Sequence, residues 1–221
     1  MKNISIAIDG PSAAGKSTIA KMVAKKKNYI YIDTGAMYRS VALYCLNHHI
    51  DLNDEGEIKK HLENIHIKMD QNNHIYLNDE DVSETIRQDE VSLAASKVSI
   101  HPSVRSFLVE QQRNMAASKN VILDGRDIGT VVLPQASLKI YQIASVETRA
   151  LRRFKENKER GMDVDLETIK KEIEERDYQD MHREVSPLKK ADDAIEIDTS
   201  DLSLDEVVEQ VLKLINKVEE E

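Results

Sequence analysis

A run of eight residues near the start of the chain, Gly10 to Ser17, constrains its folding more than any other feature. The run reads GPSAAGKS and fits the pattern G-x-x-x-x-G-K-[ST] in full. Ile4 to Ile8 before it is apolar and indicates a buried strand, and Lys16 to Lys27 after it has a helical composition. A glycine-rich turn in this setting points backbone N–H groups and a helix N-terminus at phosphate oxygens. A chance glycine turn is therefore the weaker interpretation.

The chemistry of a nucleoside triphosphate assigns roles within this loop. Lys16 reaches the β- and γ-phosphates, and the Ser17 hydroxyl faces the Mg²⁺ that arrives with the nucleotide and keeps most of its waters. The motif predicts triphosphate binding, but it does not separate a switch, a motor and a kinase.

The rest of the chain alternates strands with helices. Four more apolar runs predict strands at 29–32, 121–124, 138–143 and 194–197. Helices are expected at 36–48, 57–64, 90–99, 103–118, 146–160, 166–183 and 204–218, the last behind a capping box of Ser203 and Glu206. This order implies an α/β fold with a five-stranded, mostly parallel sheet and helices on both faces.

One segment departs from that alternation. Residues 65–70 and 74–78 alternate apolar and polar side chains around Gln71-Asn72-Asn73, which predicts an antiparallel hairpin with one wet face. We therefore interpret residues from about 63 to 98 as an insertion.

The composition excludes several classes of protein. The 221 residues carry a net charge of −9, which disfavours nucleic-acid binding. No apolar run is long enough for a membrane span, and the N-terminus has no secretory signal. Cys45 is the single cysteine, which rules out an internal disulfide framework and favours a reducing cytoplasm. We expect a cytoplasmic monomer with small-molecule substrates.

Charged clusters follow two strands and occupy one late helix. Asp33–Arg39 and Asp124–Asp127 come at the carboxyl ends of predicted strands, where open α/β sheets bind ligands. Arg176, Asp180 and Arg183 are spaced i, i+4 and i+7, so they share one helix face. A ligand site and an intrahelical salt-bridge ladder both remain open for these three residues.

Together these segments resemble bacterial cytidylate kinase, a nucleoside monophosphate kinase family, from about Ile4 to the C-terminal helix. The most specific stretches are LDGRDIGT at 123–130 and ERDYQDMHR at 175–183. The resemblance implies a P-loop kinase fold in a single domain, 1–221. Its core would span about 1–40, 99–145 and 190–221, its monophosphate-binding region with the insertion about 41–98, and a short lid about 150–165.

The resemblance also implies residue roles. ATP would bind Gly10, Pro11, Ser12, Ala13, Ala14, Gly15, Lys16, Ser17 and Thr18. The base of CMP would be read by Thr34, Ser96, Arg105 and Asp127, and its sugar by Arg176 and Asp180. Its phosphate would be held by Arg39 and Arg126, with Arg183 on phosphate or base. Arg149, Arg153 and Lys158, with Arg152 as a weaker candidate, would lie in or near the lid. The catalytic set would be Lys16, Arg126, Arg153 and Arg183.

Two positions depart from the family pattern. Ala13 stands where many members have glycine, so we expect a backbone there that avoids positive φ. Gln179 stands where many have arginine, so one basic contact or surface pair is missing.

The implied reaction is direct in-line phosphoryl transfer from ATP to CMP or dCMP, in pyrimidine nucleotide metabolism. A phosphate acceptor is largely dianionic at neutral pH, since its second pKa is ~6, and needs no general base. Asp33 is a carboxylate that could nevertheless serve as one. Two alternatives stay open: a small P-loop kinase for UMP or a hydroxyl acceptor, and a GTP-dependent switch. The chain has no N-K-x-D guanine-reading motif, which disfavours the switch.

Overall fold

The computed structural model describes residues 3–70, 72–117, 119–159 and 161–220. The chain forms two compact units, described here one at a time. Unit 1 comprises Met1–Ile30 and Lys119–Glu221, and unit 2 comprises Tyr31–Ser118. Gln71 of the predicted hairpin turn and Arg160 of the predicted lid lie outside the described residues. The predicted boundaries of core, insertion and lid stay predictions.

The main sheet has five strands in the order β2-β6-β1-β7-β8, which confirms the predicted α/β fold. The strands are β1 (Ser5–Asp9), β2 (Ile30–Asp33), β6 (Val121–Gly125), β7 (Leu138–Ile143) and β8 (Ile195–Asp198). The pairs β1–β6, β1–β7 and β7–β8 are parallel. β1 and β6 end in register, with Ile8 opposite Asp124 and Asp9 opposite Gly125. Each strand therefore carries an acidic residue at its carboxyl end, and the one-residue offset places the Asp9 and Asp124 side chains on opposite faces of the sheet.

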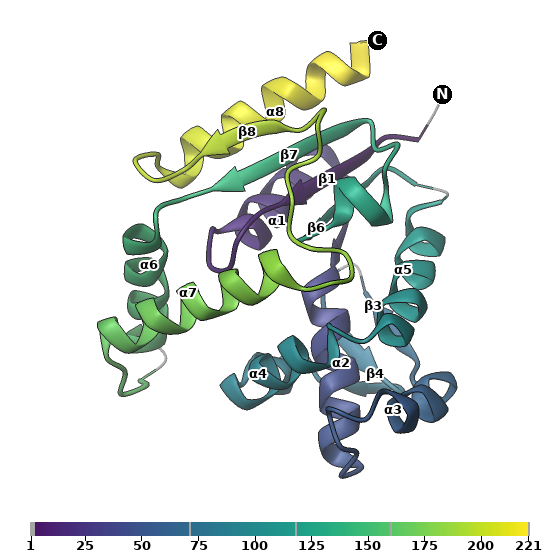
Figure 1. Cartoon of the computed structure of the whole chain (residues 1–221). Coiled ribbons are helices and arrows are strands. Elements are labelled where there is room, and N and C mark those ends of the chain that lie inside the picture. The colour runs from purple at the N-terminus through teal and green to yellow at the C-terminus, as the bar shows by residue number, and fades with distance from the viewer. Residues whose placement is uncertain (1–2, 71, 118, 160, 221) are drawn as a thin grey trace. The chain divides into compact units, whose positions relative to one another are not determined.

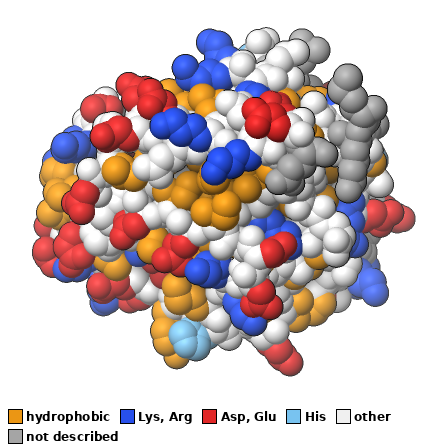
Figure 2. Space-filling view, turned by 90° about the horizontal axis from the view of Figure 1, so that it is seen from above, with side chains coloured by type: hydrophobic (Ala, Val, Ile, Leu, Met, Phe, Trp, Pro, Cys, Tyr) orange, Lys and Arg blue, Asp and Glu red, His pale blue; other side chains and the backbone are white. Residues whose placement is uncertain are grey.

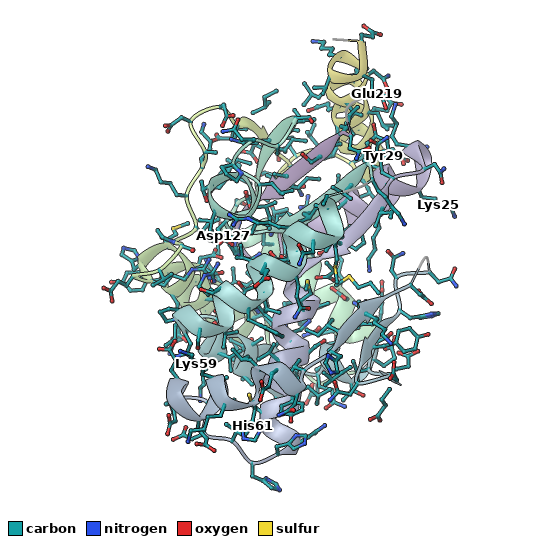
Figure 3. The ribbon with its side chains drawn as sticks, turned by 90° about the vertical axis from the view of Figure 1, so that its right-hand side faces the viewer. Lys25, Tyr29, Lys59, His61, Asp127 and Glu219 are labelled. Carbon is teal, nitrogen blue, oxygen red and sulfur yellow. The ribbon has the colours of Figure 1, made fainter. Side chains whose placement is uncertain are left out.

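Four helices of unit 1 cover and extend this sheet (Figure 1). α1 (Lys16–Lys27) contacts β1, β6 and α8 (Leu204–Glu220), and α8 also contacts β7. Ser203 and Glu206 cap α8 as predicted, since each bonds the other's backbone or side chain. α6 (Val146–Glu159) packs against α7 (Leu166–His182). Far from the carboxyl edge, Tyr29 Oη donates to Glu219 at 2.6 Å and ties the end of α8 down (Figure 3).

Unit 2 is built around a helix pair and a small antiparallel sheet. α2 (Thr34–Asn47) packs along α4 (Asp89–Val98), with α3 (Glu55–His61) and α5 (Pro102–Ala116) beside them. The sheet has the order β3-β4-β5 (Ile67–Met69, Ile75–Leu77 and Glu80–Asp81). The predicted hairpin is β3–β4. The third strand was not predicted, because two exposed acidic residues carry no apolar alternation.

The surface agrees with a chain of mixed charge. On the face drawn in Figure 2, Lys and Arg side chains are scattered among Asp and Glu. Of the helices in the described part of the chain, none is long and apolar enough to cross a membrane.

Candidate functional site

The phosphate loop joins β1 to α1 and depends on two glycines. Gly10 has φ 151° and Gly15 has φ 86°, both outside the usual range for L residues. A Cβ on Gly10 would also lie 2.0 Å from the Gln142 carbonyl oxygen of β7, so no side chain fits there. Ala13 has φ 57°, which shows our expectation for this position to be wrong. The residue adopts the left-handed conformation even though it costs ~1–2 kcal/mol for an L residue.

Lys16 is held inside the loop. Its Nζ donates to the Pro11 carbonyl at 2.6 Å, and the residue is only 5% exposed. Burial and then the neighbouring charge of Arg126 lower its pKa to about 7, although Asp124 and Asp9 oppose this. Near pH 7 the Lys16 ammonium is close to losing its proton. A bound anion would stabilise the charged form, because nearby negative charge raises the pKa of a lysine.

Ser17 and Asp124 bring together oxygen atoms suited to a magnesium ion. Ser17 Oγ donates to Asp124 Oδ2 at 2.6 Å, and Asp124 is buried. Hydroxyl and carboxylate oxygens fit Mg²⁺, which usually takes few protein ligands together with water and phosphate. Among the described residues, no group of three or more His, Cys, Asp or Glu side chains could hold a metal.

Asp9 is a site residue that the sequence analysis did not assign. Its carboxylate accepts from Ile128 N at 2.8 Å and Gly129 N at 2.7 Å, at a short π-helical turn spanning Ile128–Val132. Burial raises its pKa to about 6 although these two N–H groups oppose the rise. A Cβ on Gly129 would lie 3.4 Å from Asp9 Oδ2 and 3.1 Å from the Lys139 stem. An acid directly after a buried strand was the available signal, since buried charges need partners.

An arginine and aspartate cluster lies in unit 1 beside this edge. Arg126 Nε donates to Asp180 Oδ2 at 2.8 Å, and Arg183 Nη1 lies 3.6 Å from Asp180 Oδ1. Arg183 Nη2 is 3.9 Å from Asp127 Oδ1. Burial raises the pKa of Asp180, but the charges of Arg126, Arg176 and Arg183 outweigh burial and hold the pKa below its usual value. Because Arg126 comes from another segment, the cluster is more than an intrahelical ladder.

Two arginines of α6 contact the phosphate loop, and the lid expected at about 150–165 stays a prediction. Arg149 is buried and donates to Ser12 O at 2.9 Å, so it contacts the phosphate loop. Arg152 contacts Ala14 O at 3.5 Å and Thr199 O at 2.6 Å. Both guanidinium groups are engaged with the protein, because the start of α6 packs beside the loop. Arg153 is half-buried and Lys158 is exposed, and their lid roles stay predictions.

In unit 2, Arg39 lies at the start of α2. Asp33 caps this helix by accepting from Ala36 N at 2.8 Å. Arg39 Nη2 is 3.4 Å from both carboxylate oxygens of Asp33. Arg39 Nε is buried and makes no hydrogen bond within the described chain. This guanidinium therefore keeps donor capacity for an anion.

The other predicted acceptor residues of unit 2 lie on three helices. Thr34 is buried at the first position of α2, and Ser96 is half-buried on α4. Arg105 of α5 is buried, donates to Ser99 O at 3.1 Å and lies 5.4 Å from the Tyr38 ring centroid. The predicted acceptor set thus has members in both units; those of unit 1 are Arg126, Asp127, Arg176, Asp180 and Arg183.

Comparisons with known proteins agree with this chemistry. Residues 6–217 match the family described as cytidylate kinase. The chain is 52% identical over 218 residues to a cytidylate kinase of Geobacillus sp. (strain WCH70), covering 97% of each chain. It is 51% identical over 218 residues to that of Leuconostoc mesenteroides subsp. mesenteroides, again covering 97% of each. In fold alone it is similar to an uncharacterised protein from Eubacterium ventriosum, with a TM-score of 0.53 and 14% identity over 97% of this chain and 99% of that one.

Proposed function

This chain belongs to the cytidylate kinase family, and on that premise we propose how its residues carry out the reaction. The chain is a kinase that phosphorylates CMP to CDP with ATP in nucleotide metabolism. The observation that carries the assignment of roles is the contact between a complete phosphate loop and an acidic strand end, made by Ser17 and Asp124.

On the donor side, we assign ATP to the loop from Gly10 to Thr18. Lys16 leaves the Pro11 carbonyl and donates to the β- and γ-phosphates, and the negative charge keeps it protonated. Ser17 and Asp124 would hold the Mg²⁺ of the nucleotide, and this ion would supply neutralisation of charge on the phosphate oxygens. Asp9 holds the turn after Asp127, so its part is positioning.

On the acceptor side, arginines grip the monophosphate. Planar guanidinium groups bind phosphate through paired hydrogen bonds, and we assign this role to Arg39, Arg126 and Arg183. Asp180 and Arg176 meet the sugar hydroxyls, while Thr34, Ser96, Arg105 and Asp127 read the base. Arg153 reaches the transferring group from α6. The acceptor oxygen is already ionised near neutral pH, so positioning and electrostatic stabilisation are the whole mechanism.

We also propose that dCMP is accepted, and that the protein acts as a monomer in the cytoplasm. Cys45 is buried and burial raises its pKa to about 11. The thiol is therefore inert and suits a reducing compartment. Sedimentation of the purified protein tests the oligomeric state.

One substrate panel tests the assignment. Purified protein with Mg·ATP is assayed for ADP release with CMP, dCMP, UMP, AMP and shikimate as acceptors. We expect turnover with CMP and dCMP. Turnover with AMP or shikimate and none with CMP or dCMP would contradict the proposal.

A further inference from the structure

We propose that Asp177 and Arg149 are positioning residues for the phosphate donor, acting through the Ser12 peptide of the phosphate loop. The part of this proposal that is tested by the KM for ATP rests on the proposed function. The part tested by the Kd for ADP does not. Neither residue touches the substrate in this role. They hold the loop from outside, and the loop's main chain holds the nucleotide.

The contacts form a closed buried triangle. Ser12 N donates to Asp177 Oδ1 at 2.9 Å, and Arg149 Nη1 donates to Ser12 O at 2.9 Å. Arg149 Nη1 also pairs with Asp177 Oδ2 at 2.5 Å. The Arg149 and Asp177 side chains are 5% and 10% exposed. Both backbone groups of Ser12 are thus satisfied by one ion pair, and Arg149 Nε is fixed on Ala144 O at 2.9 Å.

The same outward pattern continues along the loop. Ala14 O accepts from Gln142 Nε2 and, at 3.5 Å, from Arg152 Nη1. Carbonyl oxygens held by donors outside the loop are kept from facing an incoming phosphate, and this favours inward N–H groups. Ala13 lies between the two clamped peptides with φ 57°. Strained backbone of this kind persists where the surroundings over-determine it, and the clamps on Ser12 and Ala14 supply that constraint.

Asp177 gives the ERDYQDMHR stretch a second task. Asp180 turns toward Arg126, whereas Asp177 turns toward the phosphate loop. Arg149 comes from α6 and Asp177 from α7, so both of these packed helices contact the loop through one ion pair. A shift of either helix would therefore change the position of the Ser12 peptide.

A purely structural ion pair is the competing explanation, and a matched control separates the two. Asp177→Asn keeps the shape and removes the charge that Arg149 needs. Asp193→Asn does the same to Lys139, whose side chain is 8% exposed and bonds the more exposed Asp193, at 65%, at 2.8 Å. Both variants leave a buried cation without its carboxylate, so both should lower Tm.

The two variants should differ in nucleotide handling. For Asp177→Asn we expect the Kd for ADP, measured by calorimetry without CMP, and the KM for ATP to rise by about tenfold or more, because small misplacements at such sites are costly. The KM for CMP should stay within about twofold, as should every nucleotide constant of Asp193→Asn.

A lower Tm for Asp177→Asn with ADP affinity and ATP KM unchanged would overturn the proposal and leave a structural pair. If Asp177→Asn does not fold, Arg149→Lys decides, since it keeps the charge but lacks the planar fork that spans three acceptors. Unchanged ADP affinity in Arg149→Lys would also overturn it. An absence of CMP-dependent turnover in the unaltered protein would instead contradict the proposed function. The ADP measurement would still test whether Asp177 and Arg149 position the phosphate loop.

Discussion

The phosphate loop of unit 1 and Arg39 of unit 2 are held in opposite ways. In the loop, Lys16, Ser12 and Ser17 make contacts of 2.6 to 2.9 Å with buried partners. Arg39 has only 3.4 Å contacts to Asp33, and its Nε has no hydrogen bond within the described residues. The residues that we assign to the phosphate donor are therefore organised in advance, as electrostatic catalysis requires, whereas Arg39, which we assign to the acceptor, keeps donor capacity for a ligand.

The largest loss of activity is expected for Lys16→Ala, on the donor side. In the proposed mechanism the substitution removes a charge on the β- and γ-phosphates, and kcat/KM should fall by about 10²–10³, as for other single stabilising donors. CMP affinity, measured by calorimetry, should change by less than about threefold. A loss of CMP affinity of similar size would mean that Lys16 contacts both substrates. The division between a donor side and an acceptor side would then not hold for this residue.

Arg126→Ala tests an arginine that, like the residues of the phosphate loop, already has a short contact with a buried partner. It removes the proposed phosphate contact and leaves Asp180, whose side chain is 9% exposed, without its 2.8 Å partner. We expect kcat/KM for CMP to fall by more than about tenfold, that is by at least ~1.4 kcal/mol in transition-state stabilisation. A smaller change would assign Arg126 to structure alone.

Proton uptake on ADP binding tests the pKa of Lys16. Its pKa is about 7 in the ligand-free protein because of burial and Arg126, and a bound phosphate raises it. The bound state then holds more protons above pH 7, so ADP affinity falls as pH rises, by up to ~tenfold per pH unit. Calorimetry at pH 8 in buffers of different ionisation enthalpy should detect uptake of up to about one proton. Lys16→Ala should abolish it; uptake that survives in this variant would assign the proton elsewhere.

Two variants of Asp33 test the acceptor side. Asp33→Ala removes the cap of α2 and should lower the free energy of unfolding by about 1 kcal/mol, whereas Asp33→Asn keeps the cap. If Asp33 only caps α2 and pairs with Arg39, the kcat of Asp33→Asn should stay within about threefold of the unaltered protein. A fall of about 10² or more would identify Asp33 as a general base.

The smallest expected effect concerns Ala13. Ala13→Gly relieves a left-handed strain of ~1–2 kcal/mol but adds ~0.5–1 kcal/mol of unfolded-chain freedom. The free energy of unfolding from urea titration should therefore rise by about 0.5 kcal/mol. Ala14→Gly is the matched control, because Ala14 has no positive φ, and it should be destabilising. Equal effects of the two variants would argue against strain at Ala13.

Much of the fold was predictable because the elements are periodic. The span of α1 was predicted without error, and β7 matched as well. The turn at Ile128–Val132 was not predicted, because its conformation depends on the Asp9 carboxylate and carries no pattern of its own. The contact of Arg149 with the Ser12 carbonyl was not predicted, because the position of a residue on a helix does not indicate where its guanidinium points.

The sequence by itself determined the phosphate loop, the order of the main-sheet strands and the α-helices, and the candidate residues, because each depends on contiguous residues or short spacings. The tertiary structure alone decided which of these residues meet. Asp9 bonds Gly129 across 120 residues, Ser12 bonds Asp177 across 165, and Arg126 bonds Asp180 across 54. Such pairs leave no periodic signal in one chain, because they exist only where the sheet and its packed helices bring distant segments together.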